Sequence, residues 1–188
     1  MSTPRRRRFL WIALGILLVL LLLGVWVVPA LGGRLMNGTV DGALPPVPEA
    51  ALAVHSSLAV ADLHADVLLW DRDPLERASW GHVDVPRLIE GRVAVQGFTV
   101  VTKVPRGMNI EANAGDSDQI TLLAVLGRWP ARTWSSLLER ALWQADRLRA
   151  AADASGGRLT LLRTAAELDA YLARRASETD ITAAFLGL

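Results

Sequence analysis

The feature that most constrains this chain is an uncharged apolar run close to its N-terminus. Residues 9–31 contain no Asp, Glu, Lys or Arg over 23 consecutive positions. A helix needs about 20 apolar residues to cross the hydrocarbon core of a bilayer, so this run predicts a transmembrane anchor. Four arginines at 5–8 directly precede it. Because basic residues stay on the cytoplasmic side, we expect residues 1–8 in the cytoplasm and the rest exported, either periplasmic or extracellular.

A cleaved signal peptide is the alternative to this anchor. The apolar core of a signal peptide is shorter, at about 7–15 residues, although the small residues at 27–33 offer a cleavage site. We favour the uncleaved, single-pass anchor, in which Trp11 and Trp26 lie at the two bilayer interfaces. Both alternatives export the remainder of the chain.

Composition limits what the exported part can be. The 188-residue chain has no cysteine, so a hydrophobic core, rather than disulfides, must stabilise it. Without the four arginines at 5–8, 16 of the 20 basic residues remain against 19 acidic ones. The exported part is therefore slightly acidic, which argues against nucleic acid as a partner.

Glycine and proline divide the chain into a linker at 32–54 and one α/β domain at 55–188. Apolar runs predict strands at 58–63, 93–102, 159–162 and 181–188, and helical patterns predict helices at 84–90, 117–127, 134–154 and 165–176. Strands that alternate with helices indicate a parallel sheet. We expect the first strand to be buried, and the second to be covered on both faces.

Three local patterns set the details of the helices. Asp84 is expected to cap the helix at 84–90, and Thr164 with Glu167 forms a capping box before the last helix. The helix at 134–154 is expected to bury one apolar stripe, which comprises Trp134, Leu137, Leu138, Ala141, Leu142, Ala145 and Leu148.

His64 and Asp66 are the candidate site of the domain. They follow the first predicted strand, and the two-residue period of a strand places their side chains on the same side. An imidazole nitrogen and a carboxylate oxygen are both zinc ligands, but a catalytic zinc usually has three protein ligands. Taken alone, the pair also fits a structural hydrogen bond. His82 is a weaker candidate for a third ligand, His55 is expected to be solvated, and Asp62 is expected to make a structural hydrogen bond.

Several stretches together carry a family resemblance. "DLHAD" at 62–66 precedes "DVPRLIEGRVAVQ" at 84–96, and "LLRTAAELDAYL" at 161–172 precedes "DITAAFLGL" at 180–188. In this combination and spacing, residues 58–188 resemble the membrane (renal) dipeptidase family of the amidohydrolase superfamily. The resemblance implies a partial (β/α)8 TIM-type barrel, with about the first three strands of the barrel in residues 55–188.

The resemblance also implies a chemistry. His64 and Asp66 would be metal ligands in a site that holds two Zn²⁺ ions, and the substrate would be a dipeptide. The family's bridging glutamate and two later histidines would come after residue 188. No catalytic residue is therefore assigned here, and the substrate-binding residues stay unknown. We expect this truncated chain to be inactive alone. A homodimer is among the partners that the family suggests. Another amidohydrolase, or a non-catalytic membrane-anchored module, are the alternatives.

Overall fold

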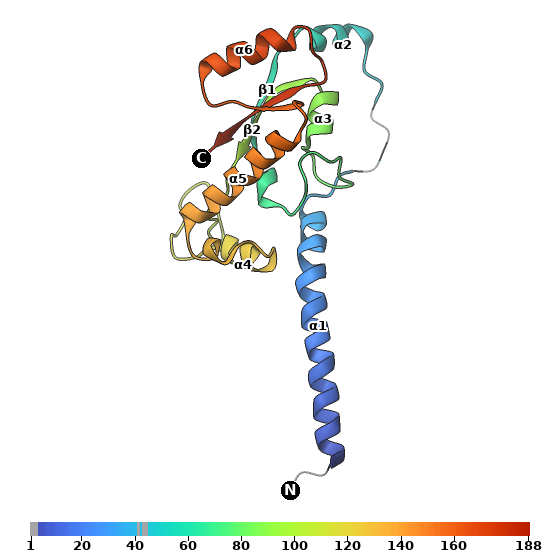
Figure 1. Ribbon diagram of the computed structural model, residues 1–188, viewed down its shortest axis with the longest axis vertical. Coiled ribbons are helices and arrows are strands. Elements are labelled where there is room, and N and C mark those ends of the chain that lie inside the picture. The colour runs from blue at the N-terminus through green and yellow to red at the C-terminus, as the bar shows by residue number, and fades with distance from the viewer. Residues whose placement is uncertain (1–3, 41, 43–44) are drawn as a thin grey trace.

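The computed structural model describes residues 4–40, 42 and 45–188, with side chains except those of 4, 5 and 28–30. Residues 1–3 of the predicted cytoplasmic segment and residues 41 and 43–44 of the predicted linker lie outside the described residues. In chain order, the elements are α1 (Pro4–Met36), α2 (Glu49–Ser56), β1 (Val60–Ala65), the 3-10 helix η1 (Val67–Leu69), α3 (Val85–Glu90), β2 (Val93–Thr99), α4 (Gln119–Leu126), the 3-10 helix η2 (Ala131–Thr133), α5 (Leu137–Ala154), β3 (Leu159–Leu161), α6 (Ala165–Arg175) and β4 (Thr182–Gly187) (Figure 1).

Helix α1 extends away from the rest of the chain as a long rod (Figure 1). It is long and apolar enough to cross a membrane, and its apolar window is not buried against the domain. The helix continues past the apolar run to Met36. Parts of the predicted linker at 32–54 are helical, because α1 covers its start and α2 begins at Glu49. Alanine and leucine dominate α2, and these residues favour a helix, which begins directly after the N-cap Pro48.

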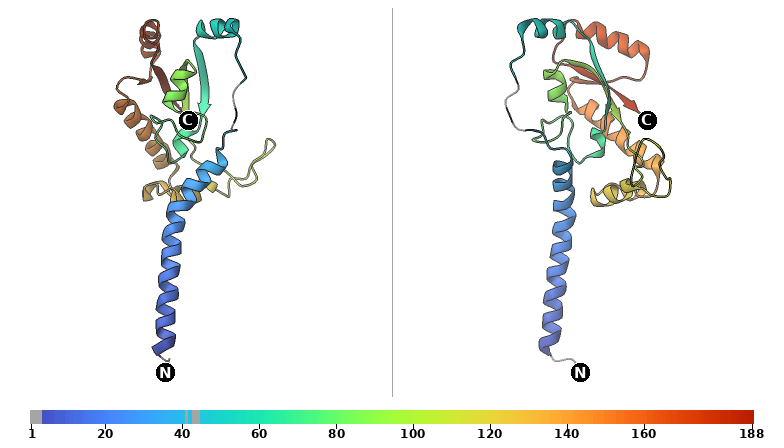
Figure 2. Two further views of the ribbon diagram at one scale, coloured as in Figure 1. Left: turned by 90° about the vertical axis from the view of Figure 1, so that its right-hand side faces the viewer. Right: turned by 180° about the vertical axis from the view of Figure 1, so that it is seen from behind.

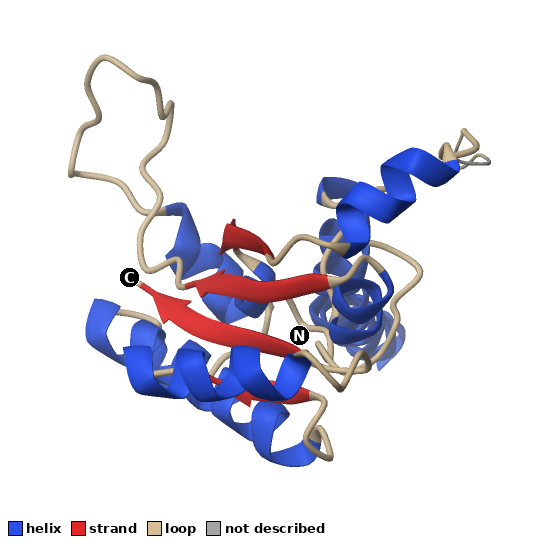
Figure 3. Cartoon of the chain, turned by 90° about the horizontal axis from the view of Figure 1, so that it is seen from above, coloured by secondary structure: helices blue, strands red, loops and turns tan. Residues whose placement is uncertain are grey.

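Four parallel strands form one open sheet in the order β1-β2-β4-β3 (Figure 3). This confirms the predicted parallel sheet. The connection from β2 to β3 passes over β4, and the chain then returns through α6 to β4. Because such crossovers are right-handed, the return places α6 on the face opposite α3 and α5. Helices therefore cover both faces of the sheet.

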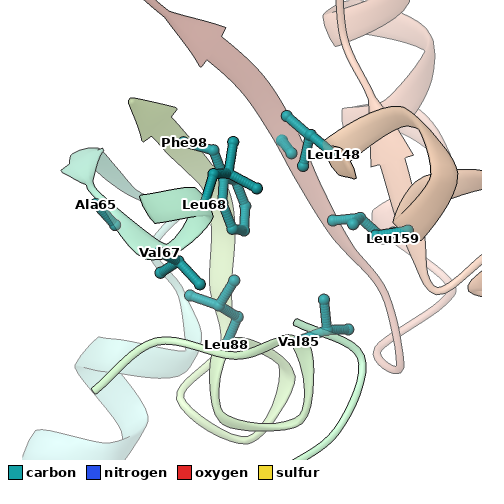
Figure 4. Packing of buried hydrophobic residues seen from close by; sticks show 10 residues of the cluster. Ala65, Val67, Leu68, Val85, Leu88, Phe98, Leu148 and Leu159 are labelled. Atoms are coloured by element: carbon teal, nitrogen blue, oxygen red, sulfur yellow. The ribbon is translucent and has the colours of Figure 1, made fainter. Parts of the chain in front are cut away.

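The two faces of β2 contact different helices. Phe98 packs with Leu68, Leu88 and Leu148, which join β2 to η1, α3 and α5 (Figure 4). On the opposite face, Val95 contacts the cluster around Tyr171 of α6. The prediction of a strand covered on both sides is thus confirmed for β2. The Tyr171 hydroxyl also donates a hydrogen bond of 2.8 Å to the carbonyl of Ala94.

β1 does not follow the prediction of a buried strand. It lies at the edge of the sheet, and the side chains from Ala61 to His64 are exposed. Leu63, which was expected in the core, is 67% exposed. The apolar pattern of this segment could not show that only one neighbouring strand, β2, would cover it.

Half of the buried face of α5 is polar, which corrects the predicted apolar stripe. Leu148 is buried as predicted, but its companions on that face are Arg140, Gln144 and Ala151, whereas the predicted Leu137, Leu138 and Leu142 are exposed. Arg140 donates to the carbonyls of Thr102 and Thr133, and Gln144 exchanges hydrogen bonds with the backbone of Val101. The loops around α5 carry buried carbonyls that need donors, and this need outweighs the burial of leucine.

The predicted caps are confirmed. The Asp84 carboxylate accepts a 3.0 Å hydrogen bond from the Arg87 amide at the start of α3. The capping box of Thr164 and Glu167 closes the start of α6. His55 is partly exposed, in line with the expected solvation, and its Nε2 also lies 3.0 Å from the carbonyl oxygen of Gly91, which connects α2 to the end of α3.

Candidate functional site

The candidate site lies at the carboxyl end of β1, where the strand is irregular. Asp62 pairs with Gln96 of β2 and Ala65 pairs with Phe98, so β1 has one more residue than β2 between these pairs. This is a β-bulge, a feature that re-aims side chains and is common beside active sites. β1 approaches Gly97 closely at this point, since a Cβ atom there would lie 2.4 Å from the Leu63 carbonyl oxygen. Only glycine fits this contact.

His64 and Asp66 converge as predicted, but not because of a regular strand period. Asp66 lies beyond the end of β1 and precedes η1, with φ −84° and ψ 37°. The chain has therefore turned before Asp66, and the bulge has shifted the strand before it. The result is a distance of 3.3 Å between His64 Nε2 and Asp66 Oδ1, with side chains that are 72% and 40% exposed.

Thr99 completes the immediate surroundings of Asp66, and the sequence did not single it out. Its hydroxyl donates a hydrogen bond to Asp66 Oδ1 from the carboxyl end of β2. The signal that could have identified it is its position, because neighbouring parallel strands end at the same edge of the sheet. Thr99 therefore fixes one carboxylate oxygen and leaves the other free of protein hydrogen bonds among the described residues.

A small cavity opens beside this pair. Its volume is about 220 Å³, and its lining includes Asn37, His64, Asp66, Arg72 and His82. Asn37 follows the last turn of α1, and its carbonyl accepts a 2.8 Å hydrogen bond from the Gly81 amide. The end of the anchor helix thus forms part of the wall of the candidate site, which the sequence could not indicate.

A buried ion pair supports the opposite wall. Arg72 Nη2 lies 2.9 Å from Asp84 Oδ2, and both side chains are almost fully buried. Burial lowers the pKa of the Arg72 guanidinium, and the Asp84 carboxylate opposes that shift. Arg87 also contacts Asp84. This cluster ties the loop that carries His82 to the start of α3.

The other candidate ligands do not join His64 and Asp66. The Asp62 carboxylate accepts a 3.2 Å hydrogen bond from the His64 amide, a structural role as expected. His82 lines the same cavity, but the described part of the chain contains no group of three or more His, Cys, Asp or Glu residues that could hold a metal.

The pair itself fits two ligands of one zinc ion. Zinc binds nitrogen and carboxylate oxygen at about 2.0–2.2 Å, so two ligands of a tetrahedral ion are roughly 3.3–3.5 Å apart. The separation of His64 Nε2 and Asp66 Oδ1, 3.3 Å, agrees with this value, and it also fits a direct hydrogen bond. The donor types and their convergence therefore fit zinc, while the number of donors provides only part of a site.

Comparisons with known proteins identified no relative of this chain. No protein-family model matches the chain, and neither a curated protein nor a solved structure matched it. The mixed α/β fold, its parallel sheet and the single apolar N-terminal helix are what the structure establishes.

Proposed function

We propose that this chain contributes two metal ligands, His64 and Asp66, to a membrane-anchored zinc peptidase of the dipeptidase type. The observation that carries the proposal is the convergence of an imidazole nitrogen and a carboxylate oxygen at the carboxyl edge of a parallel sheet. Active sites of α/β barrels lie at this edge. The family resemblance on residues 58–188 supports the same assignment.

The order of the strands fits the proposed assignment in part, although α6 covers the face of the sheet that a closed barrel would enclose. The resemblance assigns β1, β2 and β4 to the first three barrel strands, and these strands lie side by side in that order. β3 lies beyond them at the far edge. The sheet also borders an apolar hollow of about 860 Å³, whose lining includes Leu63, Val95 and Phe185.

Each residue of the site has a distinct role in this proposal. His64 and Asp66 would hold the ion, and Thr99 orients the carboxylate of Asp66 by its hydrogen bond. Bound zinc supplies Lewis-acid polarisation of a peptide carbonyl and activates water for attack. The walls formed by Asn37 and Arg72 restrict how a substrate approaches this pair.

Nuclear magnetic resonance of the imidazole nitrogens tests the proposal directly. The chain has only three histidines, His55, His64 and His82, so each ring can be assigned, and His55, which does not line the cavity, serves as the internal control. On titration of the full chain with Zn²⁺ in nanodiscs, we expect the His64 nitrogen signals to shift and those of His55 to stay unchanged. Asp66→Asn should weaken the response at least tenfold, which corresponds to about 1.4 kcal/mol.

The contrary results are equally specific. If the His64 nitrogens do not respond to zinc, or if they respond equally in wild type and Asp66→Asn, the pair is a structural hydrogen bond and the proposal is wrong. Hydrolysis of a dipeptide by residues 1–188 alone would contradict the expected incomplete site, since two ligands fall short of the usual three.

A further inference from the structure

Helix α4 is an uncharged helix on the surface of the domain. Its eight residues, Gln119–Leu126, include no Asp, Glu, Lys or Arg. α6, another surface helix, carries Glu167, Asp169 and Arg174 among its residues. Water solvates charged faces readily, whereas apolar helix faces are normally covered. α4 therefore requires an explanation that α6 does not.

One face of α4 is covered by the domain and the other is not. Ile120 and Ala124 are buried with Trp129, whose ring centroid lies 4.2 Å from that of Trp143 on α5. Trp129 and Trp143 thus join the segment after α4 to α5. Leu122 and Val125, one helical turn apart, are 62% and 39% exposed. Their exposed face points away from the domain because Ile120 and Ala124 occupy the face toward it.

Trp134 is a partly exposed aromatic residue next to α4. Its indole is 40% exposed, and its carbonyl accepts a 3.3 Å hydrogen bond from the Thr121 hydroxyl of α4. Leu122, Val125 and Trp134 together are called the α4 patch below. Tryptophan favours the boundary between water and lipid, so its presence beside two aliphatic side chains is typical of a surface that touches a membrane.

The position of α4 along the anchor indicates that the bilayer is the partner of the α4 patch. α4 lies beside α1, at the end of the domain nearest the apolar run, in all three ribbon views (Figures 1 and 2). The Arg128 guanidinium, two residues after α4, lies 4.0 Å from the ring centroid of Trp26. Trp26 lies near the outer end of the apolar run, where the sequence predicts the outer bilayer interface. α4 is therefore held at the level of that interface.

Two further contacts hold the domain against the anchor in this position. Gly33 of α1 faces the Trp80 ring, since a Cβ atom there would lie 3.0 Å from Trp80 Cη2. The Asn37 carbonyl accepts the hydrogen bond from the Gly81 amide. Arg128 also pairs with Asp71 at 3.2 Å. These contacts come from two segments of the domain, residues 80–81 and Arg128, and Arg128 is the one that holds α4 itself near Trp26.

From this geometry we infer that α4 is an interfacial helix, whose α4 patch inserts into the headgroup and acyl boundary of the bilayer that α1 spans. The domain is then attached to the membrane at two places. The inference rests on the proposed anchor but not on the proposed zinc chemistry. It implies that the carboxyl edge of the sheet, with His64 and Asp66, faces the membrane surface.

Depth measurements with single cysteine labels test this inference, and the chain has no native cysteine to interfere. Leu122→Cys, Leu172→Cys and Leu17→Cys are each labelled with an environment-sensitive fluorophore in the full chain in nanodiscs. Leu172 is the matched control, because it is a partly exposed leucine on α6. Leu17 lies within the apolar run and reports on the anchor itself.

We expect lipids with a quencher on the acyl chain to quench the labels at 17 and 122 but not the label at 172. Aqueous iodide should quench the label at 122 roughly threefold less than the label at 172, because an interfacial helix lies about 5–10 Å into the boundary. Arg128→Ala should reduce lipid quenching at 122 and leave it unchanged at 17.

Each other outcome overturns the inference and identifies what failed. If the label at 17 is quenched by lipid and the label at 122 is as open to iodide as the label at 172, the anchor holds and α4 faces water. If the label at 122 is protected from iodide without lipid quenching, a second copy of the chain covers the patch. If the label at 17 is not quenched by lipid, the anchor itself is wrong.

Discussion

β1 and β2 are neighbouring strands of similar apolar character, yet the fold uses them in opposite ways. β2 has helices on both faces, and Ala94, Gln96 and Phe98 are fully buried. β1 lies at the edge, and its residues up to His64 are exposed or only partly buried. The strand that carries the candidate ligands thus contributes little to the core, while its neighbour provides both the core and the Thr99 hydroxyl that holds Asp66.

This difference suggests that stability and chemistry are separable in the domain. Residues on β2 should be sensitive to truncation, because their environment is densely packed. Residues on β1 should tolerate truncation, because solvent already surrounds them. The predictions below test this separation, from the largest expected effect to the smallest.

Phe98→Ala should cause the largest loss of stability. The ring is fully buried against Leu68, Leu88 and Leu148, so its removal leaves a cavity as well as losing buried area. We expect the free energy of unfolding to fall by about 3–5 kcal/mol, measured by chemical denaturation of the full chain in detergent. Leu63→Ala on β1 is the matched control and should cost less than about 0.5 kcal/mol. Equal effects of the two substitutions would break the comparison.

Arg140→Gln should have the next largest effect. The Arg140 guanidinium is buried, lies 2.6 Å from Asp118 Oδ2 and donates to the carbonyls of Thr102 and Thr133. Breaking one partner of such a pair costs roughly 3 kcal/mol. Urea denaturation at pH 7 measures this loss, and a cost below about 1 kcal/mol would show that the loops near the end of β2 do not depend on Arg140.

The same pair predicts a dependence on pH. Burial raises the pKa of Asp118, but hydrogen bonds from Arg140, Thr121 and the Ile120 amide outweigh it and leave the pKa below its ordinary value. A lowered folded-state pKa stabilises the fold above the unfolded pKa, about 4, and this contribution is lost as the pH falls through the folded value. Denaturation between pH 7 and pH 3 should show a steeper loss in wild type than in Arg140→Gln.

Tyr171→Phe should have a moderate effect that grows smaller at high pH. The hydroxyl donates to the Ala94 carbonyl of β2, so its loss should cost about 1 kcal/mol. Burial raises the pKa of Tyr171. Its stabilising contribution is therefore present below the ordinary value of about 10 and is lost as the pH rises through the folded value. Parallel denaturation curves of wild type and Tyr171→Phe from pH 7 to pH 11 should converge.

His64→Ala should have the smallest effect on stability. The side chain is 72% exposed, so we expect a change within about 0.5 kcal/mol of wild type in denaturation without added metal. The same substitution should abolish the zinc response of the candidate site. A large loss of stability without metal would show that His64 is a structural residue, and the distinction between β1 and β2 would then fail.

Most of the element order was predictable because local patterns specify it. The four strands and the four domain helices of the sequence analysis all occur, with ends that differ by three residues at most. The errors concern which faces are buried. On α5, the predicted leucines are exposed and Arg140 with Gln144 is buried, because the partners of that face are backbone carbonyls from distant loops.

The candidate site was also predictable only in part. His64 and Asp66 stand out as residue types, but their convergence depends on a bulge opposite Gly97 and a turn at Asp66. Thr99 and Asn37 come from segments far along the chain from His64. No local pattern connects them to the site, because their proximity results from the pairing of β1 with β2 and from the contact between α1 and the loop at Gly81.

The sequence by itself determined the apolar helix, the alternation of strands and helices, and the presence of a histidine and an aspartate after the first strand. These features follow from composition and from periodicities of a few residues. Only the tertiary structure decided that β1 is an exposed edge, that Arg140 is buried, and that α4 lies against the anchor at Trp26. Burial depends on which segments pack together in space, and short-range sequence patterns do not specify these long-range contacts.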